Sequence, residues 1–335
     1  MHDMPGMPAL PPFDWHVLAT HWTLHPGWVI AGVVLLLGYL YAVHRARTRG
    51  AHVHWARIGC WVAGVVLLEL TLASAIDTYA MSAFWIHMIE HLILIMVVPA
   101  LLVCGGPLAV VAGALPERGR SRLVAALRSR PVAVVTHPLV GMVLYGAVIV
   151  ATHLTSFMDQ MAMHPWLMTF EQVLYLVSGW LMLLTLVGHE PIRWRVPYLF
   201  RIGLLMIGMV PDTIVGIVLM QADKDPFPVF MAMHPAWAPP PLRDVQIGGA
   251  LMWVGGDGLM MCFAVGVVVA MISAPGRQAQ VIGPWLESVR RHTLTDRLSE
   301  SGAQAGAEAS DAVDPDSEEA RAAYNRMLER LNRGG

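Results

Sequence analysis

The chain alternates between long apolar runs and shorter segments that hold most of its charges. Each apolar run has roughly 17 to 25 residues, which is enough for a helix to cross about 30 Å of hydrocarbon. The runs cover approximately residues 28–44, 57–77, 84–104, 132–153, 168–188, 201–220 and 247–272. The pattern predicts an all-α fold, a polytopic membrane helical bundle with seven transmembrane helices.

Three regions follow from this pattern. Residues 1–27 are an outer N-terminal segment, residues 28–272 the seven-helix membrane domain, and residues 273–335 a cytoplasmic tail. Between residues 299 and 318 the tail consists mainly of Ala, Gly, Ser, Asp and Glu. Because such a composition buries too little apolar surface to offset the entropy of folding, the tail is predicted to be largely disordered.

Arg and Lys are distributed unevenly between the two sides of the predicted bundle. All of them except Lys224 and Arg243 fall on one side, in the connections after the first, third and fifth helices and in the tail. Cytoplasmic loops retain positive charge. The N-terminus is therefore predicted to lie outside the cell and the C-terminus in the cytoplasm.

The composition is that of a protein surrounded by lipid, with 56% hydrophobic and only 14% charged residues. A formal net charge of -2 gives no support for nucleic-acid binding. Cys60, Cys104 and Cys262 form no close-spaced pair, so neither a disulfide nor a thiolate metal motif is predicted.

The sharpest local motif is the sequence HMIEH in the third predicted helix, from His87 through Met88 and Glu90 to His91. His87 and His91 are four residues apart, so both imidazoles project from one face of the helix and can share a metal ion. Polar side chains are costly inside a membrane and usually serve a pathway or a site. We interpret the pair as metal ligands; structural, hydrogen-bonded histidines are the alternative.

Further polar residues could complete or surround such a site. His153 ends the fourth helix on the same side and His164 follows in the next loop, and either is a candidate third or fourth ligand. Glu171 lies at a shallow depth in the fifth helix. Charged residues near helix centres predict a polar interior, a protonated carboxyl or a relay; these are Glu69, Asp212 and Asp257.

Two loops on the predicted outer side repeat almost the same sequence, MAMHPW at 161–166 and MAMHPAW at 231–237. Pro suits a first helical turn and Trp the membrane interface, so the HP(x)W part is predicted to start helices. Thioether and imidazole are ligands that suit Cu(I). We interpret the other part as an auxiliary copper-binding edge, with loop packing as the alternative; its residues are Met161, Met163, Met231, Met233 and His234.

Three segments of the chain resemble the caa3-type cytochrome c oxidase assembly factor family, CtaG. Residues 83–107 are similar to the family's HMxxH helix, which runs into a Pro and a Gly-x-Pro turn. Residues 137–153 are similar to the next helix, which ends in a His. Residues 243–253, with Asp244 and the pattern GGxxMW, are similar to the start of the last helix. The resemblance covers about residues 15 to 272.

The resemblance implies a multi-pass protein of the bacterial plasma membrane, not an enzyme, that helps to assemble a haem-copper oxidase. It implies copper, as Cu(I), as the bound ion, the catalytic subunit of the oxidase as recipient, and an extracytoplasmic copper donor as a further partner. His87, Met88 and His91 fall on the HMxxH motif. The chain departs from the family where a Glu-His pair is expected, since it has Glu171-Gln172.

Two other function classes stay open. An intramembrane metal-dependent enzyme of the hydrolase type could combine His87 and His91 with carboxylates of the helix centres, although no HExxH motif is present. A haem-binding redox protein could ligate its iron with His87 or His91 together with His153. A visible spectrum and a metal analysis distinguish these classes.

Overall fold

The computed structural model describes residues 10–23, 25–232 and 234–273. Helices account for about three quarters of this part of the chain, and no β-strand occurs in it. The predicted tail lies almost entirely outside the described residues, as do residues 1–9 of the N-terminal segment. The all-α fold class predicted from the apolar runs is confirmed.

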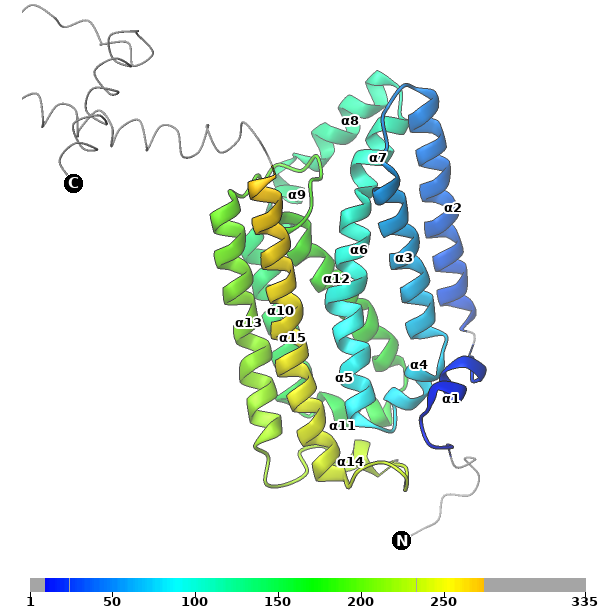
Figure 1. Cartoon of the computed structure of the whole chain (residues 1–335), viewed down its shortest axis with the longest axis vertical. Helices are drawn as coiled ribbons and strands as arrows, with labels where there is room; N and C mark the ends of the chain where they lie inside the picture. The colour runs from blue at the N-terminus through cyan, green and yellow to red at the C-terminus, as the bar shows by residue number, and fades with distance from the viewer. Residues whose placement is uncertain (1–9, 24, 233, 274–335) are drawn as a thin grey trace, which may run out of the picture. The chain divides into compact units, whose positions relative to one another are not determined.

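The helices follow one another with short connections (Figure 1). In chain order they are α1 (Trp15–Thr20), α2 (Pro26–Thr48), α3 (Trp55–Leu72), α4 (Ala75–Ala80), α5 (Phe84–Leu92), the π-helix η1 (Ile93–Val97), α6 (Val98–Gly105), α7 (Pro107–Ala114), α8 (Glu117–Leu127), α9 (Arg130–Val135), α10 (Pro138–His153), α11 (Phe157–Met163), α12 (Trp166–Leu186), α13 (Tyr198–Met220), α14 (Pro228–Met231) and α15 (Pro241–Ile272).

Six helical segments among the described residues are long and apolar enough to cross a membrane, and there are seven if α10 and α11 form one bent span. The third of them runs from Phe84 to Ala114 through α5, η1, α6 and α7. The bent pair turns by 67° between its two helices. The described residues therefore contain six to seven candidate spans, and the predicted number of seven is reached if the bent pair is one span.

The fourth predicted helix starts later than the apolar run suggested. Residues 132–135 belong to α9, and α10 begins only at Pro138. The Nδ1 atom of His137 accepts a hydrogen bond from the backbone N–H of Leu139 at 3.1 Å and caps the new helix. Proline has no N–H to donate and fits the first turn of a helix, so it separates two helices within one apolar run.

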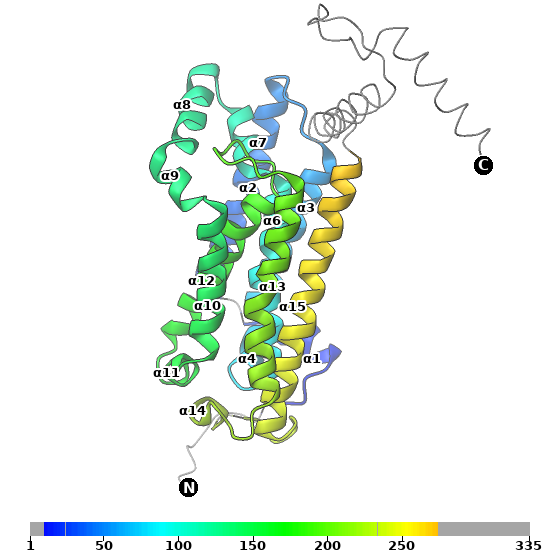
Figure 2. The same cartoon turned by 90° about the vertical axis from the view of Figure 1, so that its left-hand side faces the viewer.

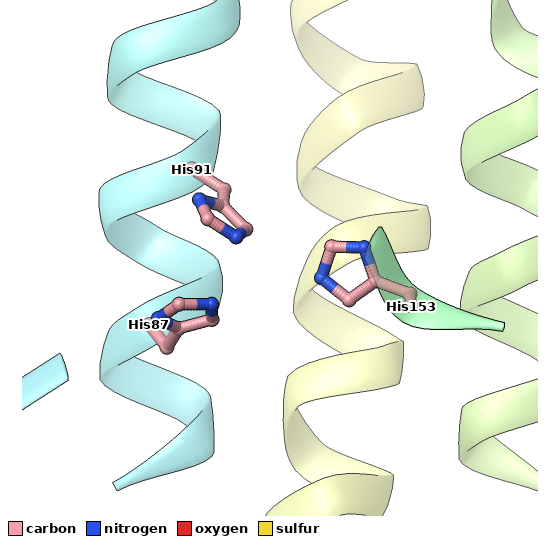
Figure 3. Close-up of side chains that lie close together, drawn as sticks. All are labelled: His87, His91 and His153. Carbon is pink, nitrogen blue, oxygen red and sulfur yellow. The ribbon is translucent and has the colours of Figure 1, made fainter. Parts of the chain in front are cut away.

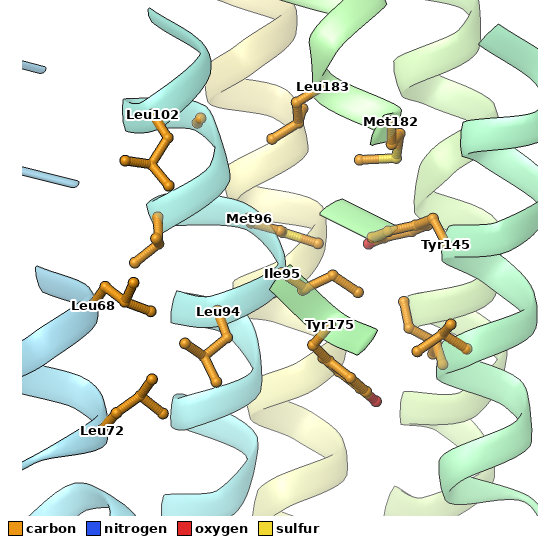
Figure 4. Packing of buried hydrophobic residues seen from close by; sticks show 14 of the residues in the cluster. Leu68, Leu72, Leu94, Ile95, Met96, Leu102, Tyr145, Tyr175, Met182 and Leu183 are labelled. Carbon is orange, nitrogen blue, oxygen red and sulfur yellow. The ribbon is translucent and has the colours of Figure 1, made fainter. Parts of the chain in front are cut away.

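The central span is shaped by Pro99, which lacks the N–H that would bond to the carbonyl of Ile95. The π-helix η1 lies at this point. A Cβ at Gly179 of α12 would lie only 1.8 Å from the Ile95 oxygen, so only glycine lets α12 approach here. Figure 4 shows the resulting core, where Leu94, Ile95 and Met96 pack between side chains of the neighbouring helices.

Different short helices lie at the two ends of the bundle (Figures 1 and 2). One end carries α8 with the exposed residues Arg118, Arg120 and Arg122, and we call it the arginine end. The opposite end carries α1, α4, α11 and α14, and we call it the α11 end. Large apolar side chains on the flanks of the spans, such as Ile30 and Val254, are exposed and suited to contact lipid.

The longest close contact between spans joins α13 and α15. A Cβ at Gly249 would lie 2.7 Å from the carbonyl oxygen of Gly216, and a Cβ at Gly216 would lie 2.7 Å from that of Gly249. Both helices therefore need glycine at this crossing. Small residues commonly allow such close approach between membrane helices.

We expect the substitution Gly249→Leu to lower the stability of the bundle by about 1 to 3 kcal/mol, because the new side chain must push α13 and α15 apart. Thermal unfolding of the protein in detergent, followed by tryptophan fluorescence, measures the effect. Gly258 of α15 has open space within 4 Å of its Cβ position, so Gly258→Leu is the matched control. Equal melting temperatures for the two variants would contradict the packing argument.

Candidate metal centre

Three histidines from two helices meet inside the bundle near the α11 end (Figure 3). His87 and His91 lie on successive turns of α5, with their ring centroids 4.1 Å apart. His153 is the last residue of α10, and its ring centroid lies 5.3 Å from that of His91. One ring nitrogen of each histidine lies within 4.8 Å of the corresponding nitrogens of the other two, a spacing that allows one metal ion to bind all three.

The cluster is closed to solvent. His87 is 0%, His91 5% and His153 2% exposed. The Nε2 atoms of all three have no hydrogen-bond partner among the described residues. Because a buried polar atom without a partner is costly, ring nitrogens that lie this close together without partners are suited to bind a cation.

Glu171 of α12 supplies a carboxylate to the same cluster. Its Oε2 atom lies 3.7 Å from Nε2 of His87, and its Oε1 atom lies 3.4 Å from Nε2 of His91. The side chain is only 1% exposed, and neither of its oxygens has a hydrogen-bond partner among the described residues. Three imidazoles and one carboxylate can therefore offer three nitrogen ligands and an oxygen ligand or counter-charge to a cation.

His153 is held in one orientation by its other ring nitrogen. Its Nδ1 atom lies 3.1 Å from the carbonyl oxygen of Ile149 and 2.9 Å from the Thr152 hydroxyl. That hydroxyl lies 2.7 Å from the hydroxyl of Tyr175. A proton on Nδ1 can be donated to the carbonyl, which leaves the lone pair of Nε2 for the cluster. Metal-binding histidines commonly show this arrangement.

Tyr175 also fixes His91, because the two rings stack at a centroid distance of 4.0 Å and an interplanar angle of 22°. A small cavity lies next to this stack. His91 and His153 line it together with two methionines and one aspartate. Met88 therefore borders a cavity next to the histidine cluster. The lining residues are Met88, His91, Leu92, Ile95, Ile149, His153, Tyr175, Asp212 and Met252.

The position of α5 is set by Asp244 in the first turn of α15. Its two carboxylate oxygens accept hydrogen bonds from the backbone N–H groups of Phe84, at 2.8 Å, and Trp85, at 3.0 Å. A carboxylate at a helix N-terminus satisfies N–H groups that have no partner inside the helix and interacts favourably with the helix dipole. His234 lies 3.2 Å from the same carboxylate and so belongs to this cap and not to the three-histidine cluster.

Gln172 occupies the position where the family pattern leads us to expect a histidine. Its Nε2 amide group donates to Asp77 at 2.7 Å and to Glu90 at 2.8 Å. Asp77 in turn lies 3.1 Å from Nε2 of His25, which is exposed. Burial raises the pKa of the Asp77 carboxyl, while its contacts with Gln172 and His25 lower it. Gln172 therefore joins two carboxyl groups behind the cluster, and Glu90 bonds to it and not to an imidazole.

Several residues predicted from the sequence lie elsewhere. His164 is exposed beside the end of α11 and is not brought to the cluster. Met161 and Met231 are buried in the core, whereas Met163 is 50% exposed. Met233 lies outside the described residues. Packing thus accounts for two of the four loop methionines.

The two repeated segments do lie together, because α11 packs against α14. Asp159 accepts hydrogen bonds from the backbone N–H groups of Val229 and Phe230. Trp166 stands in the first turn of α12, as predicted. Pro26 likewise stands in the first turn of α2. Trp237 does not start a helix, since α15 begins at Pro241; its ring N–H instead donates to the Leu10 carbonyl, which ties the N-terminal segment to this loop.

The intramembrane carboxyl groups do not form one relay. The hydroxyl of Tyr145 donates to Asp212, and the hydroxyl of Thr213 donates to Asp257 at 2.9 Å. Glu69 lies apart from both, with its carboxylate against Gly32 of α2. The prediction of a polar interior therefore applies to the contact of α10, α13 and α15, and Glu69 belongs to a different helix contact.

Sequence reasoning did not find the residues that orient the cluster, namely Thr152 and Tyr175. A signal for Tyr175 exists, because it stands four residues after Glu171 and so shares its helix face. The sequence marks Gln172 only as a departure from the family pattern and does not predict its two hydrogen-bond partners, which come from other helices.

The fold and the cluster together define a class, a multi-pass helical membrane protein with a buried three-histidine, one-carboxylate centre. The family model described as cytochrome c oxidase caa3 assembly factor (Caa3_CtaG) matches residues 37–274. The chain belongs to this family and is a multi-pass protein of the bacterial plasma membrane.

Similar proteins come from mycobacteria, and all are described as uncharacterized. Those of Mycobacterium bovis and Mycobacterium tuberculosis are each 30% identical over 311 residues, which is 90% of this chain and 43% of the relative. That of Mycobacterium leprae is 30% identical over 229 residues, 66% of this chain and 35% of the relative. The chain thus spans less than half the length of these relatives. No solved structure matches it significantly.

We expect Asp244→Asn to destabilise the bundle by about 1 kcal/mol, because the amide keeps only one acceptor oxygen for the two N–H groups of α5. The melting temperature in detergent measures the loss. Asp223 is an exposed acid in a loop, so Asp223→Asn removes the same charge without a cap. If both variants melt like the wild type, Asp244 does not hold α5 in place.

Proposed function

We propose that this protein binds a copper ion between His87, His91 and His153 and delivers it to the catalytic subunit of the oxidase that its family helps to assemble. The observation that carries the proposal is the set of three buried imidazoles that each bring one ring nitrogen within 4.8 Å of the others, with Nε2 atoms that have no hydrogen-bond partner among the described residues. Copper is the cargo in this proposal, and the histidines hold it only for a time.

The chemistry of the ligands supports copper. Imidazole binds either oxidation state of copper, and thioether favours Cu(I). Met88 and Met252 line the cavity beside His91 and His153, so soft sulfur atoms border the imidazole cluster. Glu171 can offset the positive charge of the ion, which lowers the cost of holding it in a water-excluded interior.

The cover over the cluster suggests the route of transfer. Phe230 of α14 lies with its ring centroid 5.8 Å from that of His87, and Phe84 stacks on Phe227 at 5.4 Å. Because Phe230 of α14 packs against His87, displacement of α14 would open a route by which copper can enter and leave. The Arg distribution predicts that this end faces the outside, where a copper donor would act.

The packing around the cluster favours a single ion over haem. The ring of Tyr175 stacks directly on His91, and Phe84 and Phe230 pack around His87. A porphyrin between His91 and His153 would need a flat slot that these rings occupy. Zinc is the competing ion, since three histidines with one open position also suit catalytic zinc.

We expect His87→Ala, His91→Ala and His153→Ala each to weaken Cu(I) binding at least about tenfold, because each removes one ligand. Competition with a coloured Cu(I) chelator measures the affinity, and elemental analysis counts the metal. His164→Ala is the matched control, since this exposed histidine lies outside the cluster. Unchanged copper binding in the triple variant would refute the site. A preference for zinc, or a Soret band in the visible spectrum, would point to the other two function classes.

In cells, we expect a deletion strain to contain oxidase with little copper and low activity, because delivery is lost. The wild-type gene should restore both, the His87→Ala/His153→Ala variant should not, and His164→Ala should. The copper content of the purified oxidase is the decisive measurement. If the oxidase of the deletion strain has a normal copper content, the protein does not deliver copper. Its role in oxidase assembly would then not involve the metal.

A further inference from the structure

A second pocket lies at the arginine end, away from the histidine cluster. Its volume is about 410 Å³. It lies between the ends of α3, α6, α12, α13 and α15 that meet there. Its lining includes two arginines, Arg57 and Arg201, and apolar side chains of α6 and α15.

The polar part of the pocket is positively charged. Arg57 and Arg201 line it, and no Asp or Glu stands among the lining residues that the structure describes. The Nε atom of Arg201 donates to the Val196 carbonyl at 2.8 Å, which orients the guanidinium. The nearby carboxylate of Glu190 caps α7 by accepting from Leu108 and Ala109. Burial raises the pKa of Glu190, while these bonds and the charge of Arg57 lower it.

The rest of the pocket is apolar. Val103 of α6 and Phe263, Val267 and Ala270 of α15 form its walls. A Cβ at Gly266 would meet nothing within 4 Å, so the space at this position is open. The ligand that fits both parts has an anionic group at one end and a hydrocarbon chain at the other.

We propose that this pocket binds an anionic phospholipid of the surrounding bilayer, with its phosphate at Arg57 and Arg201 and an acyl chain along α15. Basic pockets between helix ends on the cytoplasmic side of membrane proteins suit anionic headgroups. The two guanidinium groups favour an anionic lipid over a zwitterionic lipid, because they repel the cation of the zwitterionic headgroup. The apolar walls favour a lipid over a free phosphate ion, because phosphate has no hydrocarbon chain to place against them.

Native mass spectrometry of the full chain in mild detergent tests the proposal, with phosphatidylglycerol, phosphatidylethanolamine and inorganic phosphate added separately. We expect phosphatidylglycerol to bind at least about fivefold more tightly than phosphatidylethanolamine, since each arginine near a headgroup contributes about 1 kcal/mol. Inorganic phosphate at the same concentration should not displace it.

Two substitutions locate the lipid. Arg57→Gln should weaken phosphatidylglycerol about fivefold and leave phosphatidylethanolamine unchanged. Gly266→Leu fills the open space and should weaken binding without changing any charge, whereas Gly258→Leu, on the same helix but outside the pocket, should not. Arg118→Gln is the matched charge control, because Arg118 is exposed on α8.

Equal binding of the two lipids, displacement by phosphate, or full binding in both Arg57→Gln and Gly266→Leu would overturn the proposal. The absence of any bound lipid in the wild-type chain would overturn it as well and leave the pocket to another occupant. None of these readouts depends on copper, so the result is independent of the proposed role of the histidine cluster.

Discussion

Two hydrogen bonds from the start of α5 to the carboxylate of Asp244 determine where His87 and His91 lie. They join the first turn of the last span to the first turn of the central one, so the register of α15 is transmitted to the histidines. Gly248 allows this close contact, because a Cβ there would lie 2.4 Å from the ring of Phe84. Asp244 and Gly248 of the last-helix motif thus fix the position of α5, and with it the positions of His87 and His91, without contacting these histidines.

The histidine cluster is energetically costly to bury. Three neutral imidazoles and a carboxylate in a water-excluded interior are unfavourable unless a cation or a proton joins them. Thr152 contacts His153, Tyr175 stacks on His91, and Phe230 of α14 packs against His87. A centre that is rigid underneath and covered by a short four-residue helix suits an ion that is held and then released.

The two ends of the bundle offer different chemistry. The α11 end concentrates imidazole and thioether groups around a buried centre, whereas the arginine end carries guanidinium groups beside an apolar pocket. An anionic lipid at the arginine end would anchor α3, α13 and α15 from one side of the bilayer. The histidine cluster on the other side would then keep a fixed scaffold if α14 moves.

The sequence by itself determined the helical membrane fold and the pairing of His87 with His91, because hydrophobic run length and the helical period are local properties. It left open whether His153 or His164 completes the cluster. Only the tertiary structure decided this, since α10 ends with His153 beside His91 of α5, whereas His164 lies beyond the 67° bend into α11 and is exposed. The same holds for Asp244 and Gln172, whose hydrogen-bond partners stand 160 and 82 residues away, beyond the reach of any local pattern.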